Sequence, residues 1–145
     1  MVNPIRTLVL AAAAATALGL ATPAMATPQA QINATLEADA QLWQGLFALA
    51  VADEIRKNCD AMEARTVRAT SAVWGLYNRA RGYGFSRQEI RAFQTADSTE
   101  VRMRAEVLAY FAANGVREGV PDTYCALGRS EIAAGTQAGE LLRAR

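Results

Sequence analysis

The sequence predicts an all-α fold: a small helical bundle of about four to five helices with one inter-helix disulfide. Three observations lead to this fold class. Apolar residues recur at steps of three and four from Leu42 onward, which places them on one face of a helix. Helix-capping residues precede several of these runs, and no run alternates apolar and polar residues as a half-buried strand does. The chain also contains two cysteines behind an apparent export signal, a context that favours disulfides.

Residues 1–26 have the pattern of a cleavable signal peptide. Arg6 supplies the positive charge, an apolar run covers 8–21, and Ala24 and Ala26 form the small-x-small motif that predicts Thr27 as the mature N-terminus. An uncleaved membrane anchor is the alternative, but the 14 apolar residues fall short of the roughly 20 that span a bilayer. We therefore expect a periplasmic protein with no stable membrane insertion after cleavage.

Cleavage leaves residues 27–145, a length that suits one domain with one hydrophobic core. Residues 27–36 are polar, include Pro28 and show no period, so we expect a flexible leader there. Residues 37–145 are expected to form a single helical domain.

The first predicted helix is long. No proline occurs between Asp39 and Arg81, which predicts one long helix or two nearly collinear ones. The glycines at 82 and 84 end it, because glycine readily adopts the left-handed conformation found at helix ends. Its expected apolar face consists of Ala52, Ile55, Cys59, Met62, Thr66, Ala69, Val73, Leu76 and Ala80.

Shorter helices are predicted after this stop. Ser86 and Glu89 fit a capping box, which predicts a short helix carrying Ile90 and Phe93. Asp97 is the expected cap of the next helix, which ends at the Asn-Gly pair 114–115. We expect the apolar face of that helix to be Val101, Ala105, Leu108 and Ala112.

The last predicted helix runs from about Asp122, just after Pro121, to Leu142. Three glycines lie on roughly one stripe of it and weaken the helix by about 1 kcal/mol each relative to alanine. Because glycine has no side chain, the stripe also lets a neighbouring helix approach closely. The three are Gly128, Gly135 and Gly139.

Cys59 and Cys125 are the only cysteines, so only one intramolecular pairing exists. The predicted bridge joins the middle of the long helix to the start of the last helix across 66 residues. The chain-entropy model gives about 4 kcal/mol of stabilisation for such a loop. A redox-active pair is the alternative, but it usually has Cys-x-x-Cys spacing and an exposed thiolate. The position of Cys59 on the apolar face favours a structural bridge.

Composition excludes several function classes. The chain contains no histidine, which rules out Ser-His-Asp and Cys-His catalysis and leaves carboxylates as the remaining metal ligands. Without residues 1–26, and therefore without Arg6, 14 basic and 14 acidic side chains balance, which disfavours nucleic-acid binding. We expect no cofactor, no metal and no catalytic residue. A carboxylate-only hydrolase remains an alternative, with five candidate groups: Asp53, Glu54, Glu63, Glu131 and Glu140.

A run of charges surrounds Cys59 and is a possible partner-binding face. It consists of Asp53, Arg56, Lys57, Arg65 and Arg68. The solvated side of an amphipathic helix is the alternative interpretation. Four aromatic residues at helical spacing are expected in the core rather than in a ligand cage: Trp43, Phe47, Trp74 and Tyr77.

Four segments of the chain resemble a family of small exported alphaproteobacterial proteins classed as a domain of unknown function, family 5333. They are the runs 52–59, 84–91, 125–132 and 141–143, with sequences ADEIRKNC, GFSxxEIR, CALGRSEI and LLR, where x marks a position outside the resemblance. The likeness extends from about Gln44 to Arg145, and the two cysteines match. It implies export and a helical, disulfide-linked domain, and it brings no activity.

We therefore expect an exported, non-catalytic interaction or accessory protein of the periplasm. Its partner is expected to be another periplasmic protein or an envelope component. The alternatives are the carboxylate-dependent hydrolase, acting on envelope polysaccharide, and a secreted enzyme inhibitor.

Overall fold

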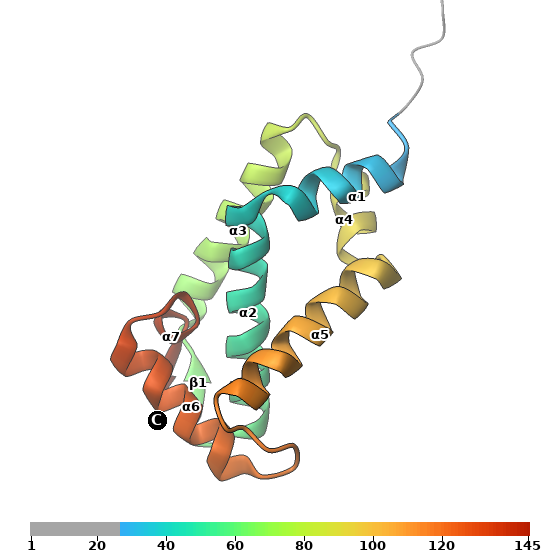
Figure 1. Ribbon diagram of the computed structural model, residues 1–145. Coiled ribbons are helices and arrows are strands. Elements are labelled where there is room, and N and C mark those ends of the chain that lie inside the picture. Colours follow the sequence, from blue (N-terminus) through green and yellow to red (C-terminus); the bar gives the residue numbers. More distant parts are fainter. Residues whose placement is uncertain (1–26) are drawn as a thin grey trace, which may run out of the picture.

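The computed structural model describes residues 27–145, and the predicted signal peptide at 1–26 lies outside the described residues (Figure 1). The described chain is mainly helical, as predicted, but its seven helices exceed the expected four to five and two short strands were not expected. The elements are α1 (Gln29–Ala38), α2 (Ala40–Asn58), β1 (Met62–Ala64), α3 (Thr66–Gly82), α4 (Arg87–Gln94), α5 (Asp97–Ala113), α6 (Pro121–Ala134), α7 (Gln137–Glu140) and β2 (Leu142–Ala144).

Helix α2 is the central helix of the molecule and contacts most of the other elements. It starts at Asp39, whose Oδ1 accepts a hydrogen bond from the Leu42 N–H at 3.1 Å, a side-chain cap of the kind that starts helices. Figure 1 shows α1 across one end of α2, α3 and α5 on either side of it, and α6 at its other end. Most of the other elements therefore take their position from this one helix.

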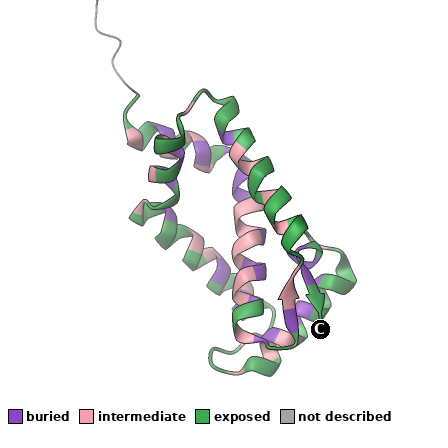
Figure 2. Cartoon of the chain, turned by 180° about the vertical axis from the view of Figure 1, so that it is seen from behind, coloured by how far each residue is buried: buried purple, intermediate pink, exposed green. Residues whose placement is uncertain are grey.

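Two clusters of buried side chains lie along α2. The upper cluster joins α1, α4, the start of α2 and the end of α3, with Leu36, Leu42 and Phe93 buried in it. The lower cluster joins the second half of α2 to α5, α6, α7 and β2, and includes Ile55 and Phe111. Figure 2 shows the contrast with α3, most of whose surface is exposed.

The expected flexible leader was wrong. Residues 29–38 form α1, in which Ile32 and Leu36 are buried. These two apolar residues are one helical turn apart and pack with Ile90 and Phe93 of the upper cluster. The segment carries too few apolar residues to show a period, and this packing across the fold is what makes it helical.

The prediction of one long helix over 39–81 was also wrong. Helix α2 ends at Asn58, and Cys59 takes an extended conformation with φ −138° and ψ 106°. The chain forms strand β1 and then returns as α3, packed beside α2. Cys59 and Met62 lie beyond the end of α2, yet both are buried. Their spacing of three residues therefore resembles that of a helix face although the backbone between them is not helical.

The last helix is broken in the same way. Helix α6 ends at Gly135, whose φ of +63° is left-handed, and Thr136 then caps the short α7. The chain ends in β2, which pairs antiparallel with β1 in the register Met62↔Ala144, Glu63↔Arg143 and Ala64↔Leu142. The helix predicted to reach Leu142 therefore gives way to a strand, because β1 offers its backbone groups to this segment.

Helix α5 turns a different face to the core from the one predicted. Thr99, Val107 and Phe111 are buried, while Val101 and Leu108 are 68% and 57% exposed. The cap also differs: Ala96 precedes the helix without a side-chain hydrogen bond, and Asp97 is its first residue. The expected face was the more apolar one, but α2 and α4 contact the other side.

Several local predictions are confirmed. The capping box of Ser86 and Glu89 is formed, α3 ends at Gly82, α5 is followed by Asn114-Gly115, and Pro121 opens α6. Of the three glycines expected to permit close packing, Gly128 and Gly139 fit that role. A Cβ at Gly128 would meet Ile55 Cγ2 of α2 at 2.9 Å, and one at Gly139 would meet the backbone nitrogen of Ile132 at 2.7 Å, whereas a Cβ at Gly135 would have nothing within 4 Å.

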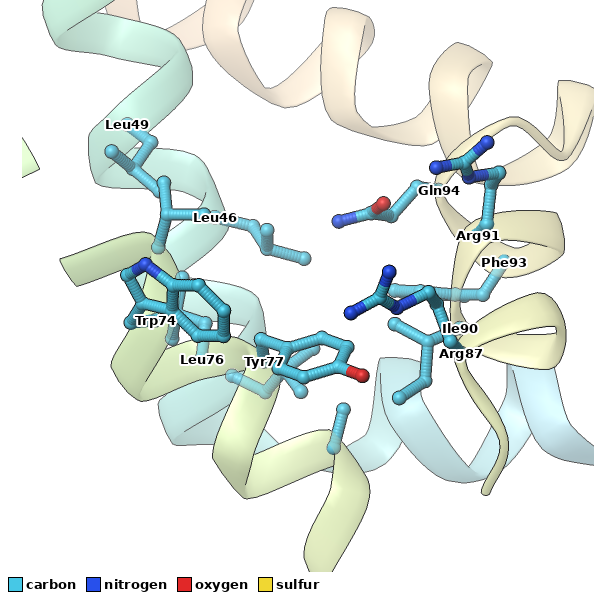
Figure 3. A pocket seen from close by; sticks show the side chains of 13 residues that line it. Leu46, Leu49, Trp74, Leu76, Tyr77, Arg87, Ile90, Arg91, Phe93 and Gln94 are labelled. Atoms are coloured by element: carbon cyan, nitrogen blue, oxygen red, sulfur yellow. The ribbon is translucent and has the colours of Figure 1, made fainter. Parts of the chain in front are cut away.

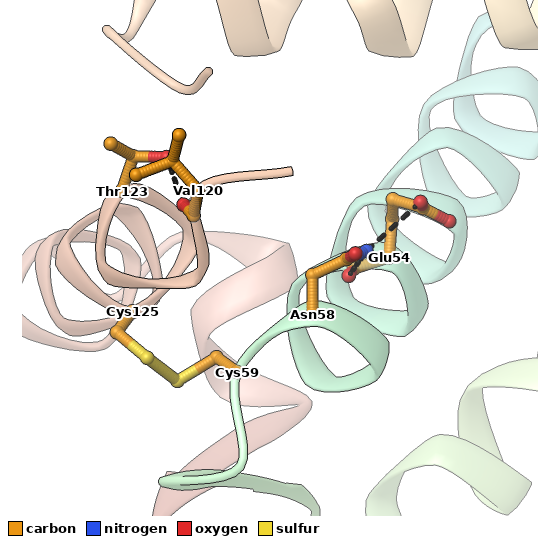
Figure 4. Close-up of a disulfide and its surroundings, with 6 residues drawn as sticks. All are labelled: Glu54, Asn58, Cys59, Val120, Thr123 and Cys125. Carbon is orange, nitrogen blue, oxygen red and sulfur yellow. Dashed lines mark hydrogen bonds between the residues drawn. A yellow bond between two sulfur atoms is a disulfide. The ribbon is translucent and has the colours of Figure 1, made fainter. Parts of the chain in front are cut away.

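The predicted disulfide is present. It joins Cys59, directly after α2, to Cys125 near the start of α6, with the two Cα atoms 5.2 Å apart (Figure 4). Both flanking helix ends have hydrogen bonds of their own: Asn58 Nδ2 donates to the Glu54 carbonyl at 2.9 Å, and Thr123 Oγ1 donates to the Val120 carbonyl at 2.7 Å. The bridge lies in the lower cluster, where Cys59 is fully buried.

Candidate functional site: a groove along helix α2

A groove of about 420 Å³ opens between α2, α3 and α4. Its size falls within the range of ligand-binding clefts. Apolar side chains of α2 and α3 form most of its lining, and polar side chains of α4 form one wall (Figure 3). The lining residues that matter below are Leu46, Leu49, Val73, Trp74, Tyr77, Arg87, Arg91 and Gln94.

The polar wall is a consequence of how α4 is built. The capping box fixes the start of α4, and Ile90 and Phe93 turn into the upper cluster. Arg87, Arg91 and Gln94 follow one another at four- and three-residue steps, so they share the remaining face. Figure 3 shows their polar ends across the groove from Leu46, Trp74 and Tyr77.

The two arginines of this wall carry uncompensated charge. Among residues 27–145, neither Arg87 nor Arg91 has a carboxylate within 4.0 Å. Arg87 and Arg91 are both exposed to solvent. The wall can therefore donate hydrogen bonds to an anionic group, and arginine is well shaped to bind a carboxylate with two of them.

The opposite wall exposes apolar surface. Trp74 is 55% exposed and Val73 is 50% exposed. Trp74 contacts Tyr77 edge to face, with ring centroids 5.7 Å apart. Four aromatic residues were predicted for the core. Trp43 is buried, Phe47 packs against the lower cluster and Tyr77 packs, partly buried, against the upper cluster, whereas Trp74 is more than half exposed in this open groove.

A second groove, of about 740 Å³, continues the first on the other side of α2, toward α5. The two share Leu46, Phe93 and Gln94, so together they form one valley with α2 as its floor. We call this the α2 valley. The α5 side contributes Met103, Val107 and Leu108, together with several charged groups.

The predicted charged face is divided by the fold. Asp53 and Lys57 line the α5 side of the α2 valley, while Arg68 lines a different groove, formed with α7. Asp53 already pairs with Arg56 at 2.6 Å and with Lys57 at 2.5 Å. Burial opposes ionisation of Asp53, but the hydrogen bonds and charges of Lys57 and Arg56 outweigh it and lower its pKa.

Arg65 and Arg68 follow the break after α2. Arg65 precedes α3, and its backbone N–H donates to the Leu141 carbonyl at 2.8 Å. Both side chains are exposed. The sequence placed them on the same helix as Asp53, and the reversal of the chain at 59–65 is what separates them.

The five candidate carboxylates lie in different surroundings. Glu131 is buried and accepts hydrogen bonds from the hydroxyls of Tyr110 and Thr136. Glu63 pairs with Arg143 at 2.6 Å and with Arg145 at 3.6 Å. Glu54 accepts from Asn58, and Glu140 lines the groove formed with α7. In the described part of the chain, no three acidic or cysteine side chains are grouped as a metal site requires.

The residues that the sequence reasoning missed are Arg87, Arg91 and Gln94. Arg91 belongs to the motif of the run 84–91 that carries the family resemblance, Arg87 is one of the two positions left open in it, and Gln94 follows three residues after the run. The available signal was the spacing of the two arginines, four residues apart behind a capping box and on the face opposite Ile90 and Phe93.

Comparison with known proteins identifies a family for this chain but no relative of known function. A family model described as a family of unknown function (DUF5333) matches residues 34–143. Neither a curated protein nor a solved structure matches the chain. Within residues 27–145, every helix is too short or too polar to cross a bilayer.

Proposed function

Because the chain belongs to the DUF5333 family, whose function is unknown, we propose a function from its surface: a non-catalytic protein that binds a partner in the α2 valley. The observation that carries this proposal is the wall of exposed apolar side chains at Val73 and Trp74 facing two arginines without carboxylate partners. Apolar surface rimmed by polar groups is typical of interaction sites.

We place the protein in an oxidising compartment outside the cytoplasm, most simply the periplasm. The disulfide supports this location, because such bridges persist where thiols are not kept reduced. The signal-peptide pattern of residues 1–26 supports it independently. The partner is then another exported protein or an envelope component.

The hydrolase alternative has less support. A general acid among carboxylates needs a raised pKa. Two of the candidate carboxylates, Asp53 and Glu54, line the α2 valley. The pKa of Asp53 is lowered because Lys57 and Arg56 stabilise its charged form against the effect of burial.

Two single substitutions on one helix test the proposal. The mature chain is immobilised and exposed to periplasmic extract, and the retained proteins are compared among variants. Val73→Glu places a charge in the α2 valley and is expected to abolish retention of the partner. Val67→Glu is the matched control, because Val67 lies on the same helix, is 81% exposed and lines the groove formed with α7.

A third variant separates the α2 valley from the charged face around the disulfide. Arg56→Glu combined with Arg65→Glu is expected to keep the partner, because neither side chain lines the valley. Loss of the partner in this variant, with retention in Val73→Glu, would move the binding site to the charged face. Equal retention by all variants would overturn the proposal.

A further inference from the structure

We propose that the α2 valley binds an amphipathic helix of the partner, with acidic residues at the end that lies against α4. This inference rests on the proposed function and names the chemistry of the occupant. It follows from three features of the valley: its length, its openness and the distribution of its charges.

The length of the valley suits a short helix. Its floor follows α2 from Leu42 at one end to Lys57 at the other. At 1.5 Å per residue this part of α2 is about 20 Å long, the length of a helix of roughly 15 residues. Helices α3 and α5 stand on either side, so a helix laid on α2 between them contacts three helices at once.

The openness of the valley favours a helix over an acyl chain. Val73, Trp74 and Leu108 are each at least half exposed, so an occupant keeps one side in water. An acyl chain has no polar side to present there, and lipid sites enclose most of their ligand. An amphipathic helix buries an apolar stripe and leaves its polar face in solvent, which is the usual geometry of helix-in-groove recognition.

Charge sets the direction of the occupant. The α4 end carries Arg87 and Arg91, neither of them in an ion pair within the described residues. The other end carries three acidic side chains beside Lys57, namely Asp53, Glu54 and Glu118, and Glu100 and Arg104 of α5 add one charge of each sign to the same groove. Acidic groups of the occupant are therefore attracted to the α4 end and repelled from the far end.

The experiment uses synthetic peptides of defined chemistry. Two dye-labelled peptides of about 15 residues share an apolar stripe at helical spacing. One has glutamates in its two N-terminal turns, and the other has lysines at the same positions. Binding to the mature, disulfide-bonded chain is followed by fluorescence anisotropy. We expect the acidic peptide to bind at least about tenfold more tightly than the basic one.

Charge reversal in the protein provides the decisive comparison. The double variant Arg87→Glu, Arg91→Glu is expected to reverse the preference, so that the basic peptide binds more tightly. The matched control is Arg117→Glu, Arg129→Glu, which alters the net charge equally at two exposed arginines outside both grooves of the valley. This control is expected to keep the preference for the acidic peptide. Circular dichroism checks that all variants are folded.

Other occupants give different results, and each overturns the inference. Dodecanoate binding with no peptide binding identifies an acyl ligand. Dimerisation in sedimentation that Val73→Glu abolishes, with no peptide binding, identifies a second copy of the chain. Equal affinity for the two peptides shows that Arg87 and Arg91 do not select an acidic occupant. If the preference is absent but Val73→Glu still loses the periplasmic partner, the binding site stands and only its occupant is wrong.

Discussion

Asp39 and Arg79 are 40 residues apart in sequence, yet Arg79 Nε donates to Asp39 Oδ2 at 2.6 Å. The Tyr83 hydroxyl donates to the same oxygen at 2.7 Å, while Oδ1 caps α2. The hydrogen bond of Arg79, opposed by burial and aided by Tyr83 and the Leu42 N–H, lowers the pKa of Asp39 to about 2. One carboxylate thus starts α2 and holds the end of α3 against it.

This cluster predicts sensitivity to acid. Because the pKa of Asp39 is lowered in the folded state, its contribution to stability is complete above the ordinary value of 3.8 and is lost as the pH falls toward 2. Asp39→Ala is expected to cost about 1–2 kcal/mol at neutral pH. Asp39→Asn keeps a capping side chain and loses the charge, so it separates the two effects. Urea unfolding at several pH values measures both, and an unchanged acid dependence in Asp39→Asn would contradict the assignment.

The hydrogen-bonded pair of Tyr110 and Glu131 predicts a loss of stability at high pH. Burial, the hydrogen bond to Glu131 and the charge of Glu131 raise the pKa of Tyr110 to about 12. The contribution of Tyr110 is therefore complete below its ordinary value of 10.0 and is lost as the pH rises toward 12. The pKa values of Tyr83 and Tyr124 are raised as well, by the hydrogen bond to Asp39 and by burial respectively, so ultraviolet absorbance titration identifies Tyr110 as the ionisation near pH 12 that Tyr110→Phe removes.

Tyr110→Phe also leaves Glu131 with one fewer donor in a buried site. We expect a loss of about 1–3 kcal/mol in the free energy of unfolding. Tyr77→Phe is the control, because the Tyr77 hydroxyl has no hydrogen-bond partner in the described chain. Equal stability of the two variants would show that the Tyr110–Glu131 hydrogen bond contributes nothing.

Two glycine substitutions should have opposite effects. A Cβ at Gly139 would overlap the backbone carbonyl of Glu131, and would meet the backbone nitrogen of Ile132 at 2.7 Å. Gly139→Ala should therefore destabilise the fold by about 1–3 kcal/mol. Gly75 lies within α3 with nothing within 4 Å of a Cβ, so Gly75→Ala should stabilise it by about 0.5–1 kcal/mol. The measurement is the thermal unfolding midpoint of each variant. Midpoints that shift in the same direction would contradict the close packing at Gly139 or the open space at Gly75.

Removal of the disulfide should be costly. The chain-entropy model gives about 4 kcal/mol as an upper estimate for the loop of 66 residues, so Cys59→Ser with Cys125→Ser should lose a large part of that. Urea unfolding of the double variant measures the loss. Mass spectrometry after alkylation, with and without prior reduction, checks the bridge itself, and two alkylated thiols without reductant would refute it.

Prediction from sequence worked where the signal was local. The capping box at Ser86, the stop at Gly82 and the start at Pro121 depend on residues within one turn of each other, and all are found. The cysteine pairing also followed, since two cysteines allow one bridge. The family resemblance is confirmed by the match over residues 34–143.

Prediction failed where structure depends on distant contacts. The break after Asn58 is stabilised by β2, whose residues lie about 80 positions further along the chain. Helix α1 depends on Ile90 and Phe93, and the buried face of α5 depends on α2. The candidate site shares this origin, since Trp74 and Arg87 face each other only because α3 reverses beside α2.

The two buried clusters along α2 are stabilised differently. The disulfide cross-links the lower cluster only, whereas the upper cluster is held by side-chain packing and by the hydrogen bonds of Asp39. Amide hydrogen exchange should therefore be faster in α1 and α4 than in α6. The proposed occupant would lie on α2 between α3 and α5 and would reach the arginines of α4, so its binding should slow amide exchange most in α4, which is far from the disulfide.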